Sequence, residues 1–323
     1  MKQYLDIVKN VLNNGQWKQN RTGTQATTTF CEIFRHQMSD GFPLLTTKKM
    51  YTQGVAVELE GFIQGITDKR WFQKRKCNIW NEWANPETVE RDWIKRMKFL
   101  GMSGQRLQGT IKKQAEKATK DLGPIYGYQW RHFDQHYSTS DGGPKTFLDR
   151  ISLDWAVNGV ERGVDQLKNV VKTLKTNPDD RRMVVLAWNP NQLSQMALPP
   201  CHYAFTLVHI NGVLNLSWKQ RSCDMMLGVP FNIANYALLL LLLCKESGLV
   251  PGELVGVLED CHIYETQIKS AIAQTSRKPY KLPTVTVGND EPSGFDIFSW
   301  THEDLFVHNY ESHPKIDFGP VAI

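Results

Sequence analysis

The sequence lacks the cysteine pairs that form disulfide frameworks and zinc sites. Its six cysteines (31, 77, 201, 223, 244 and 261) are scattered, and no Cys-x-x-Cys pair occurs. In a chain of this length without an export signal, this pattern predicts reduced thiols rather than structural disulfides. The adjacent pairs Cys201-His202 and Cys261-His262 do not have the spacing of zinc ligands, so we expect no metal site.

Long apolar segments are also missing. The N-terminal stretch Met1–Asp6 has no apolar signal core, and the longest apolar run, 237–244, is too short to cross a bilayer. No internal repeat or low-complexity tract is evident. We therefore expect a cytoplasmic protein without a membrane partner.

Positive charge is only slightly in excess over negative charge. The net charge of +5 favours anionic ligands but is too small to indicate a nucleic-acid-binding protein by itself. Hydrophobic residues make up 41% of the chain and charged residues 22%, as in an ordinary soluble globule. The length of 323 residues allows one large domain or two.

The hydrophobic pattern predicts an α+β fold. Helices are expected over 2–14, 52–64, 163–175 and 231–247, the last a long buried central helix stopped by Gly248. Strands are expected over 24–35, 183–188, 254–258 and 280–287, with a hairpin over 203–220 that turns at Asn211-Gly212. These elements do not alternate with a regular βαβ rhythm, which disfavours a doubly wound sheet. Two polar excursions, at about 86–120 and 138–163, interrupt the pattern.

The tetrapeptide Pro199-Pro200-Cys201-His202 presents one cysteine in a setting that suits a nucleophile. The two prolines deny the chain a regular helix or a central strand before the thiol. Arginines occur on both sides in sequence, and an arginine near a thiol stabilises the thiolate that attacks electrophiles. The alternative is a buried structural cysteine, the commoner fate of a single Cys.

Many motifs besides this tetrapeptide occur in one order along the chain. They are Arg21-Thr22-Gly23-Thr24, 42–49 (FPLLTTKK), 121–127 (DLGPIYG), Gln129-Trp130-Arg131, Arg181-Arg182, 196–202 (MALPPCH), 220–224 (QRSCD), 228–234 (GVPFNIA), 260–264 (DCHIY) and 320–323 (PVAI). In order and spacing they resemble the thymidylate synthase family, over nearly the whole chain except the two excursions. The resemblance implies a single domain over 1–323. It also implies a mixed sheet packed by helices, with one sheet face at a dimer interface.

The resemblance further implies a reaction. The C5 carbon of dUMP would receive a methyl group, with 5,10-methylenetetrahydrofolate as carbon and hydride donor and no metal. Cys201 would add to C6 as a thiolate, and Glu58 and Tyr126 would handle protons. Asn232 would face the O4 and N3–H edge of the ring, where the cytosine-specific branch of the superfamily has Asp. Asn232 could instead, or also, cap the N-terminus of the helix that follows Pro230-Phe231.

The remaining site residues also follow from the resemblance. Arg21, Gln220, Arg221 and Ser222 would bind the nucleotide, with Arg181 and Arg182 donated to the phosphate from a second subunit of a homodimer. His262 and Tyr264 would contact the ribose 3′-hydroxyl. On the folate side, Asp224 would pair with the pterin edge, Trp80, Trp83 and Leu198 would wall the pterin, and Lys48 would meet the glutamate tail. The terminal segment with Ala322 and Ile323 would close over the folate and exclude water.

Two departures from the family pattern leave the product open. The helix with Glu58 usually reads Glu-Leu-Leu-Trp, whereas here it reads Glu58-Leu59-Glu60-Gly61. Gly61 removes a large ring from the side near Glu58, and the space could admit water unless another side chain fills it. Water in place of hydride would make the protein a dUMP hydroxymethylase of the phage type, which would then act in a host cytoplasm. The second departure is Glu259, which stands where Gly normally precedes the Asp.

A hypothesis of a different class is nucleic-acid binding through the lysine-rich stretch 95–120. The usual role of such a charge run is a solvated helix face, so nucleic acid is an unlikely partner.

Overall fold

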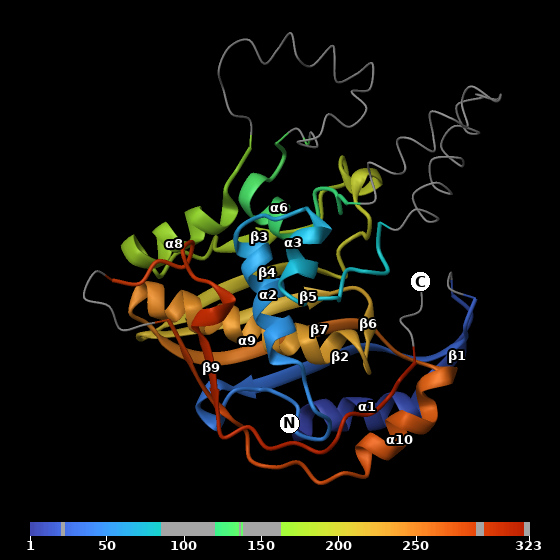
Figure 1. Ribbon diagram of the computed structural model, residues 1–323. Helices are drawn as coiled ribbons and strands as arrows, with labels where there is room; N and C mark the ends of the chain where they lie inside the picture. The colour runs from blue at the N-terminus through green and yellow to red at the C-terminus, as the bar shows by residue number, and fades with distance from the viewer. Residues whose placement is uncertain (21–22, 85–119, 136, 138–162, 289–293, 320–323) are drawn as a thin grey trace, which may run out of the picture.

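The computed structural model describes residues 1–20, 23–84, 120–135, 137, 163–288 and 294–319 (Figure 1). The excursions expected at 86–120 and 138–163 lie almost wholly outside the described residues, as do Arg21, Ala322 and Ile323.

A mixed sheet forms one layer of the molecule. Within the described residues it has seven strands in the order β1-β2-β7-β5-β4-β3, with β6 paired to β7 beside this path. Strands β5 and β6 run parallel to β7, whereas the other neighbours are antiparallel. The strands are β1 (Gln16–Lys18), β2 (Ala26–Gln37), β3 (Val184–Leu186), β4 (His202–Ile210), β5 (Val213–Gln220), β6 (Cys223–Asp224) and β7 (Val250–Tyr264). Strands β8 (Thr284–Val287) and β9 (Leu305–His308) form a separate pair.

Helices cover one face of this sheet, and the long helix α9 is central among them (Figure 1). The helices are α1 (Lys2–Asn14), α2 (Thr52–Ile63), α3 (Lys69–Lys74), α6 (Tyr126–His132), α8 (Gln166–Thr176), α9 (Gly228–Ser247) and α10 (Ile268–Thr275). By length and composition α9 could cross a membrane, but 78% of its apolar window is buried inside the protein. It contacts α2, α8, β5 and β7, so its leucine run forms the core and is not a membrane span.

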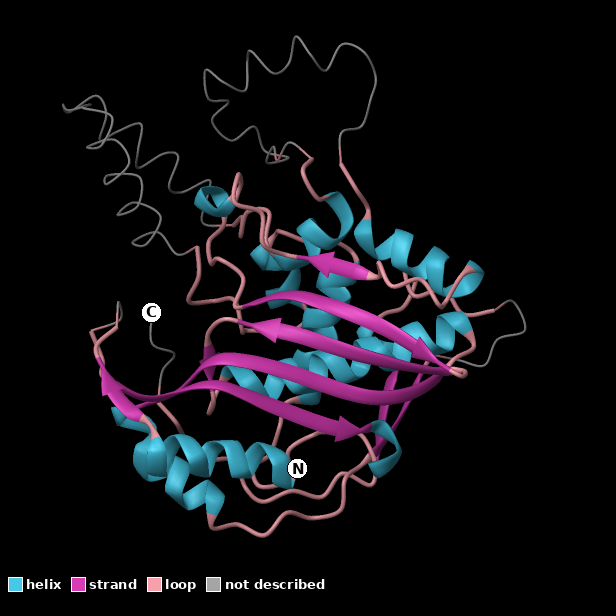
Figure 2. Cartoon of the chain, turned by 180° about the vertical axis from the view of Figure 1, so that it is seen from behind, coloured by secondary structure: helices cyan, strands magenta, loops and turns pink. Residues whose placement is uncertain are grey.

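The opposite face of the sheet, called the outer face below, has none of the described helices over it (Figure 2). Apolar side chains lie exposed there: Ile33 on β2, Val184 on β3, and Val208 and Ile210 on β4. Val208 and Ile210 are 52% and 56% exposed. An exposed group of apolar side chains of this kind is typical of an interaction surface.

Most of the predicted elements are confirmed, and the exceptions have local causes. The hairpin turns at Asn211-Gly212, where both residues have positive φ (50° and 84°), as a two-residue hairpin turn requires. Helix α9 begins at Gly228, three residues before the predicted start, because Pro230 fits the first turn of a helix. Asn232 therefore lies inside the helix, and the expectation that it caps the N-terminus is wrong.

The other boundaries differ by a few residues. Helix α8 begins at Gln166, where the Asp165 side chain caps it, and not at 163. Strand β7 covers 250–264 rather than 254–258, because both β2 and β5 pair with it over a long stretch. Strand β8 begins only after Pro283, which cannot donate a ladder hydrogen bond, so the prediction of a strand from 280 is wrong at its start.

Candidate active site

Cys201 lies at the entrance to β4 and is partly buried. Its backbone N–H donates a 2.8 Å hydrogen bond to the phenol oxygen of Tyr126, and its carbonyl accepts one from the Arg221 amide at 2.9 Å. Tyr126, the first residue of α6, is buried and has a φ of +23°, a strained value for a residue with a side chain. Burial, and then the proximity of Cys201, raise the pKa of Tyr126 well above its ordinary value. The phenol therefore keeps its proton and can donate it in a hydrogen bond.

Glu58 is a buried carboxyl group on α2, only 4% exposed. Burial raises its pKa to about 7, while the 2.6 Å hydrogen bond that Asn235 donates to Oε2 acts in the opposite direction. A carboxyl group with a pKa near neutrality can both accept and return a proton. The sequence analysis missed Asn235. The available signal was a second asparagine three positions after Asn232, on a helix that is otherwise mostly apolar.

Asn232 and Gln220 are brought together by α9 and β5. The Gln220 amide donates to Asn232 Oδ1 at 3.0 Å and to the Ser222 carbonyl at 3.0 Å. Gln220 Oε1 in turn accepts the indole N–H of Trp218 at 3.1 Å. These linked hydrogen bonds show which side-chain atom of Asn232 is the oxygen. The Nδ2 group of Asn232 is therefore the donor that remains for a ligand.

The predicted phosphate ligands that the structure describes differ in how far each lies from Cys201 and in how exposed it is. Arg221 donates from Nε and Nη2 to the carbonyls of Pro200 and Pro199, both at 2.9 Å, so its guanidinium is fixed beside the nucleophile. Arg181 and Arg182 are exposed, in the turn between α8 and β3. Arg21 lies outside the described residues.

Strands β6 and β7 bring three further predicted residues together. Asp224 on β6 is the register partner of His262 on β7, and Tyr264 follows on the same strand, 5.1 Å from His262 between ring centres. Asp224 Oδ1 accepts the amide hydrogens of Met226 and Leu227, both at 3.0 Å. These bonds hold the carboxylate rigidly at the start of α9.

Lys48 is buried (6% exposed) rather than free on the surface. Its ammonium donates to the Met226 carbonyl at 2.5 Å and lies 4.7 Å from the ring centre of Phe318. Burial lowers the pKa of Lys48 to about 8, against the opposing charge of Asp224. In this structure Lys48 therefore contacts the C-terminal part of the chain, near the place where the closing segment would begin.

The three residues expected to wall the pterin occupy different environments. Trp80 is buried, with 5.8 Å between its ring centre and that of Tyr126, and its indole N–H is directed to the Glu58 carboxyl group, whose pKa this interaction lowers against the larger effect of burial. Trp83 and Leu198 are half-buried and pack against the core.

The space expected beside Gly61 is filled. A methyl group on Gly61 would lie 2.4 Å and 2.5 Å from two ring carbons of Phe72 on α3, and 3.3 Å from Trp71. The ring of Phe72 thus takes the place of the ring that the helix lacks. The vacancy proposed from the sequence is wrong, and the alternative, that another side chain fills it, is confirmed.

The two additional acids have defined partners. Glu60 is 2% exposed, and its Oε2 accepts the backbone N–H of His302 and lies 2.6 Å from His302 Nδ1. Glu259 lies on the outer face of the sheet, where the Tyr203 hydroxyl donates to it at 2.7 Å. Neither contact could be assigned from the sequence.

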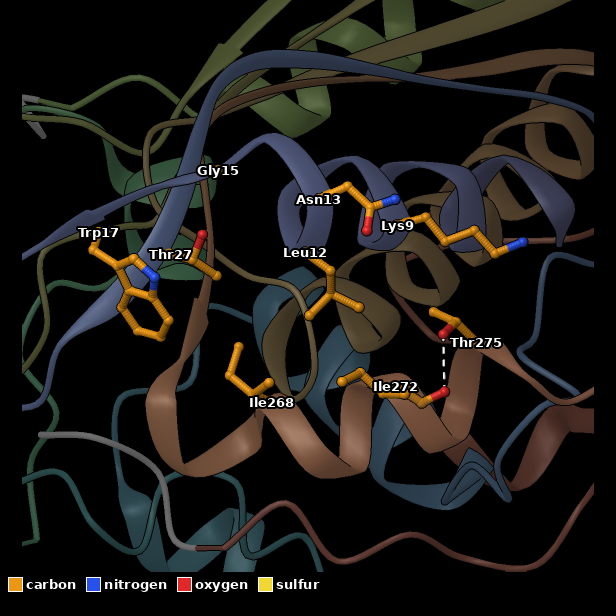
Figure 3. A pocket seen from close by; sticks show the side chains of 9 residues that line it. All are labelled: Lys9, Leu12, Asn13, Gly15, Trp17, Thr27, Ile268, Ile272 and Thr275. Atoms are coloured by element: carbon orange, nitrogen blue, oxygen red, sulfur yellow. Dashed lines mark hydrogen bonds between the residues drawn. The ribbon is translucent and has the colours of Figure 1, made fainter.

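A cavity of about 560 Å³ lies apart from these residues, between α1 and α10 (Figure 3). Leu12, Trp17, Ile268 and Ile272 line it together with the polar Lys9, Asn13 and Thr275, and Gly15 and Thr27 complete its wall. None of the predicted site residues lines this cavity. In the part of the chain that the structure describes, no group of three or more His, Cys, Asp or Glu residues could hold a metal ion.

Comparison with known proteins agrees with this arrangement. The sequence model of the family described as "Thymidylate synthase" matches residues 2–322. The chain is also 37% identical, over 325 residues, to the thymidylate synthase of Mycoplasma pneumoniae (strain ATCC 29342 / M129 / Subtype 1), and the match covers 100% of each chain.

Proposed function

The chain belongs to the thymidylate synthase family, and on that basis we propose how its residues carry out the methylation of dUMP. The protein is a folate-dependent methyltransferase of dTMP biosynthesis. The observation that carries the proposal is the hydrogen bond between Cys201 and Tyr126, because it joins the nucleophile to a proton-handling group. Three neighbouring residues complete the set: Glu58, Asn232 and Arg221.

The reaction begins with the Cys201 thiolate. Its sulfur forms a bond to C6 of the uracil, and the C5–C6 π electrons move toward O4, which makes C5 nucleophilic. Asn232 donates to the oxygen on which negative charge develops. Methylenetetrahydrofolate would supply the one-carbon unit to C5. As the C5 proton leaves, the bond between this carbon and the folate nitrogen would break, and hydride from the resulting tetrahydrofolate would reduce the methylene to methyl and leave dihydrofolate.

Proton transfer then falls to Tyr126 and Glu58. The C5 proton must leave after the carbon–carbon bond forms, and a water molecule held by the hydroxyl group of the neutral Tyr126 takes it up. Glu58, with its pKa at about 7, exchanges protons at the O4 side through ordered water. When the sulfur leaves C6, the double bond returns and the thiolate is regenerated.

Three groups of residues bind the substrates in this proposal. Arg21, Arg221 and Ser222 hold the nucleotide phosphate, Gln220 fixes Asn232, and His262 and Tyr264 contact the ribose. On the folate side, Asp224, Trp80, Trp83 and Leu198 hold the pterin, Lys48 meets the glutamate tail, and the terminal segment with Ala322 and Ile323 closes over the folate.

We propose the methyl and not the hydroxymethyl product. The argument for a hydroxymethylase depended on a space near Glu58 that could admit water. The Phe72 ring occupies that space, which supports reduction by hydride.

We further propose a homodimer that forms through the outer face. This face carries the exposed apolar residues Ile33, Val208 and Ile210, and the exposed Arg181 and Arg182 lie next to its edge strand β3. A two-fold interface would let each subunit donate both arginines to the phosphate site of the other. One domain over 1–323, acting in a cytoplasm, completes the proposal.

Mass spectrometry of the nucleotide product, with the folate oxidation state measured in parallel, tests the chemistry. Methylation gives dTMP and dihydrofolate in equal amounts. Hydroxymethyl-dUMP with tetrahydrofolate would overturn the proposed product.

A further inference from the structure

A buried acid, Glu60, and a partly buried imidazole, His302, join the catalytic helix to the C-terminal part of the chain. Glu60 Oε2 accepts the backbone N–H of His302 at 2.9 Å and lies 2.6 Å from its Nδ1. Glu60 Oε1 accepts from Gln64 at 3.3 Å and lies 3.9 Å from Arg75 Nε. Glu60 is thus held by its own helix, by the end of α3 and by the short helix η5 (His302–Asp304).

The position of Glu60 on α2 decides what this pair can do. Successive residues of a helix are rotated by about 100°, so Glu58 and Glu60 project about 200° apart, on nearly opposite sides. Glu58 is held by Asn235 of α9 on one side, and Glu60 by His302 on the other. Two buried carboxyl groups on opposite sides fix the rotation of α2 about its axis. Gly61 next to them lets the Phe72 ring pack against the helix.

The partner of Glu60 is itself firmly held. Thr301 and Asp304 close a capping box around η5, with both bonds from Thr301 to the Asp304 carboxylate at 3.0 Å. Beyond β9, the Tyr310 hydroxyl donates to the Leu45 carbonyl at 2.7 Å and accepts the Met50 amide at 2.9 Å. The chain continues to Phe318, over Lys48. His302 therefore lies at the start of a C-terminal segment, 301–319, that is anchored to the rest of the protein; it is called the C-terminal arm.

We propose that Glu60 is a positioning residue for the methylation reaction, which through His302 sets the rotation of α2 and so the place of the Glu58 carboxyl group. This inference rests on the proposed function, because it gives Glu58 a role in the reaction. The pair acts on the chemical step more than on nucleotide binding, since neither residue is among the proposed nucleotide ligands. A displacement of about 1 Å at a reacting group can cost about 100-fold in rate.

The test compares steady-state kinetics of four variants with those of the wild type. Glu60→Leu and His302→Ala remove one partner each, Glu60→Gln keeps an oxygen that can accept from His302, and Glu303→Ala changes the exposed neighbour on η5 as a matched control. We expect Glu60→Leu and His302→Ala to lower kcat about tenfold or more while KM for dUMP changes by less than about threefold. Glu60→Gln should recover most of kcat, and Glu303→Ala should behave as the wild type.

A double variant and a melting curve separate positioning from simple loss of stability. If the pair acts as one unit, Glu60→Leu with His302→Ala should lower kcat no further than the worse single variant. All assays are run well below the lowest melting temperature. Wild-type kcat in Glu60→Leu and His302→Ala, or losses that multiply in the double variant, would overturn the inference. Such a result leaves the proposed function intact, whereas a wild-type protein that makes no dTMP overturns both.

Discussion

The backbone N–H of Cys201 and the phenol oxygen of Tyr126 are joined by a 2.8 Å hydrogen bond, although 75 residues separate them. Because the phenol oxygen accepts this bond, its own proton remains available to a ligand. The same contact holds the nucleophile and fixes the direction of the Tyr126 ring, which stacks on Phe62 with 5.0 Å between centres. The reacting geometry thus depends on how α6 and β4 pack.

The Glu58→Gln variant should be less active than the wild type, and at high pH it should be more stable to unfolding. Burial raises the pKa of Glu58 from 4.5 to about 7, so folding favours its protonated form. The stability that this group contributes is complete below about pH 4.5 and is lost as pH rises through 7. Replacing it by a neutral amide should therefore raise the free energy of unfolding by about 3 kcal/mol at pH 8 and by much less at pH 5. Urea unfolding of both proteins at the two pH values measures this, and an equal difference at both would contradict the raised pKa.

Gly61→Ala should destabilise the protein, because the new methyl group would overlap the Phe72 ring. We expect a loss of about 1–3 kcal/mol in the free energy of unfolding. Combining Gly61→Ala with Phe72→Leu should give less than the sum of the two single losses, since the smaller side chain makes room. Gly228→Ala is the matched control, because its methyl group would meet nothing closer than 3.8 Å. Additive losses from Gly61→Ala and Phe72→Leu would count against the filled space.

Asn232→Asp should shift the substrate preference from dUMP toward dCMP. Gln220 donates to Asn232 Oδ1, so the Nδ2 group is free to donate to O4 of uracil. An aspartate lacks this donor and, when protonated or ionised, suits the amino group and N3 of cytosine better. The ratio of kcat/KM for the two nucleotides is the measurement, with Asn215→Asp on the outer face as control. An unchanged ratio would contradict the proposal that Asn232 contacts the edge of the pyrimidine ring.

Mixing two inactive variants should restore activity if arginines are donated between subunits. A chain with Arg181→Ala and Arg182→Ala keeps Cys201, and a chain with Cys201→Ser keeps both arginines. In the mixed dimer one site has an intact cysteine and receives intact arginines, so dTMP formation should reappear after exchange of subunits. Sedimentation should show the dimer, and Val208→Asp on the outer face should weaken it. If mixed dimers form but dTMP formation does not reappear, the result would contradict the donation of arginines across the interface.

The sequence predicted the parts of the fold that depend on local pattern. The leucine run predicted α9, and Asn211-Gly212 predicted the hairpin, because apolar composition and positive φ are properties of a few adjacent residues. The family motifs likewise predicted which residues gather near Cys201, and Gln220 and Asn232 do meet.

What the sequence could not predict depends on packing between distant segments. Gly61 indicated an empty space, but the ring that fills it belongs to Phe72 on a different helix. Glu60 looked like an isolated departure, and its partner His302 is 242 residues away. Lys48 is predicted to meet the folate tail, and the sequence did not indicate its contacts with Met226 and Phe318. Each of these outcomes required the three-dimensional arrangement.

The measurement that tests the account most directly is covalent trapping with 5-fluoro-dUMP and methylenetetrahydrofolate. Fluorine at C5 cannot leave as a proton does, so the complex should stop with the ring still bonded to sulfur. Peptide mass spectrometry should place the adduct on Cys201, and Cys201→Ser should form none while still binding dUMP. A wild-type protein that forms no adduct under these conditions, or forms it on another cysteine, would contradict the proposed chemistry.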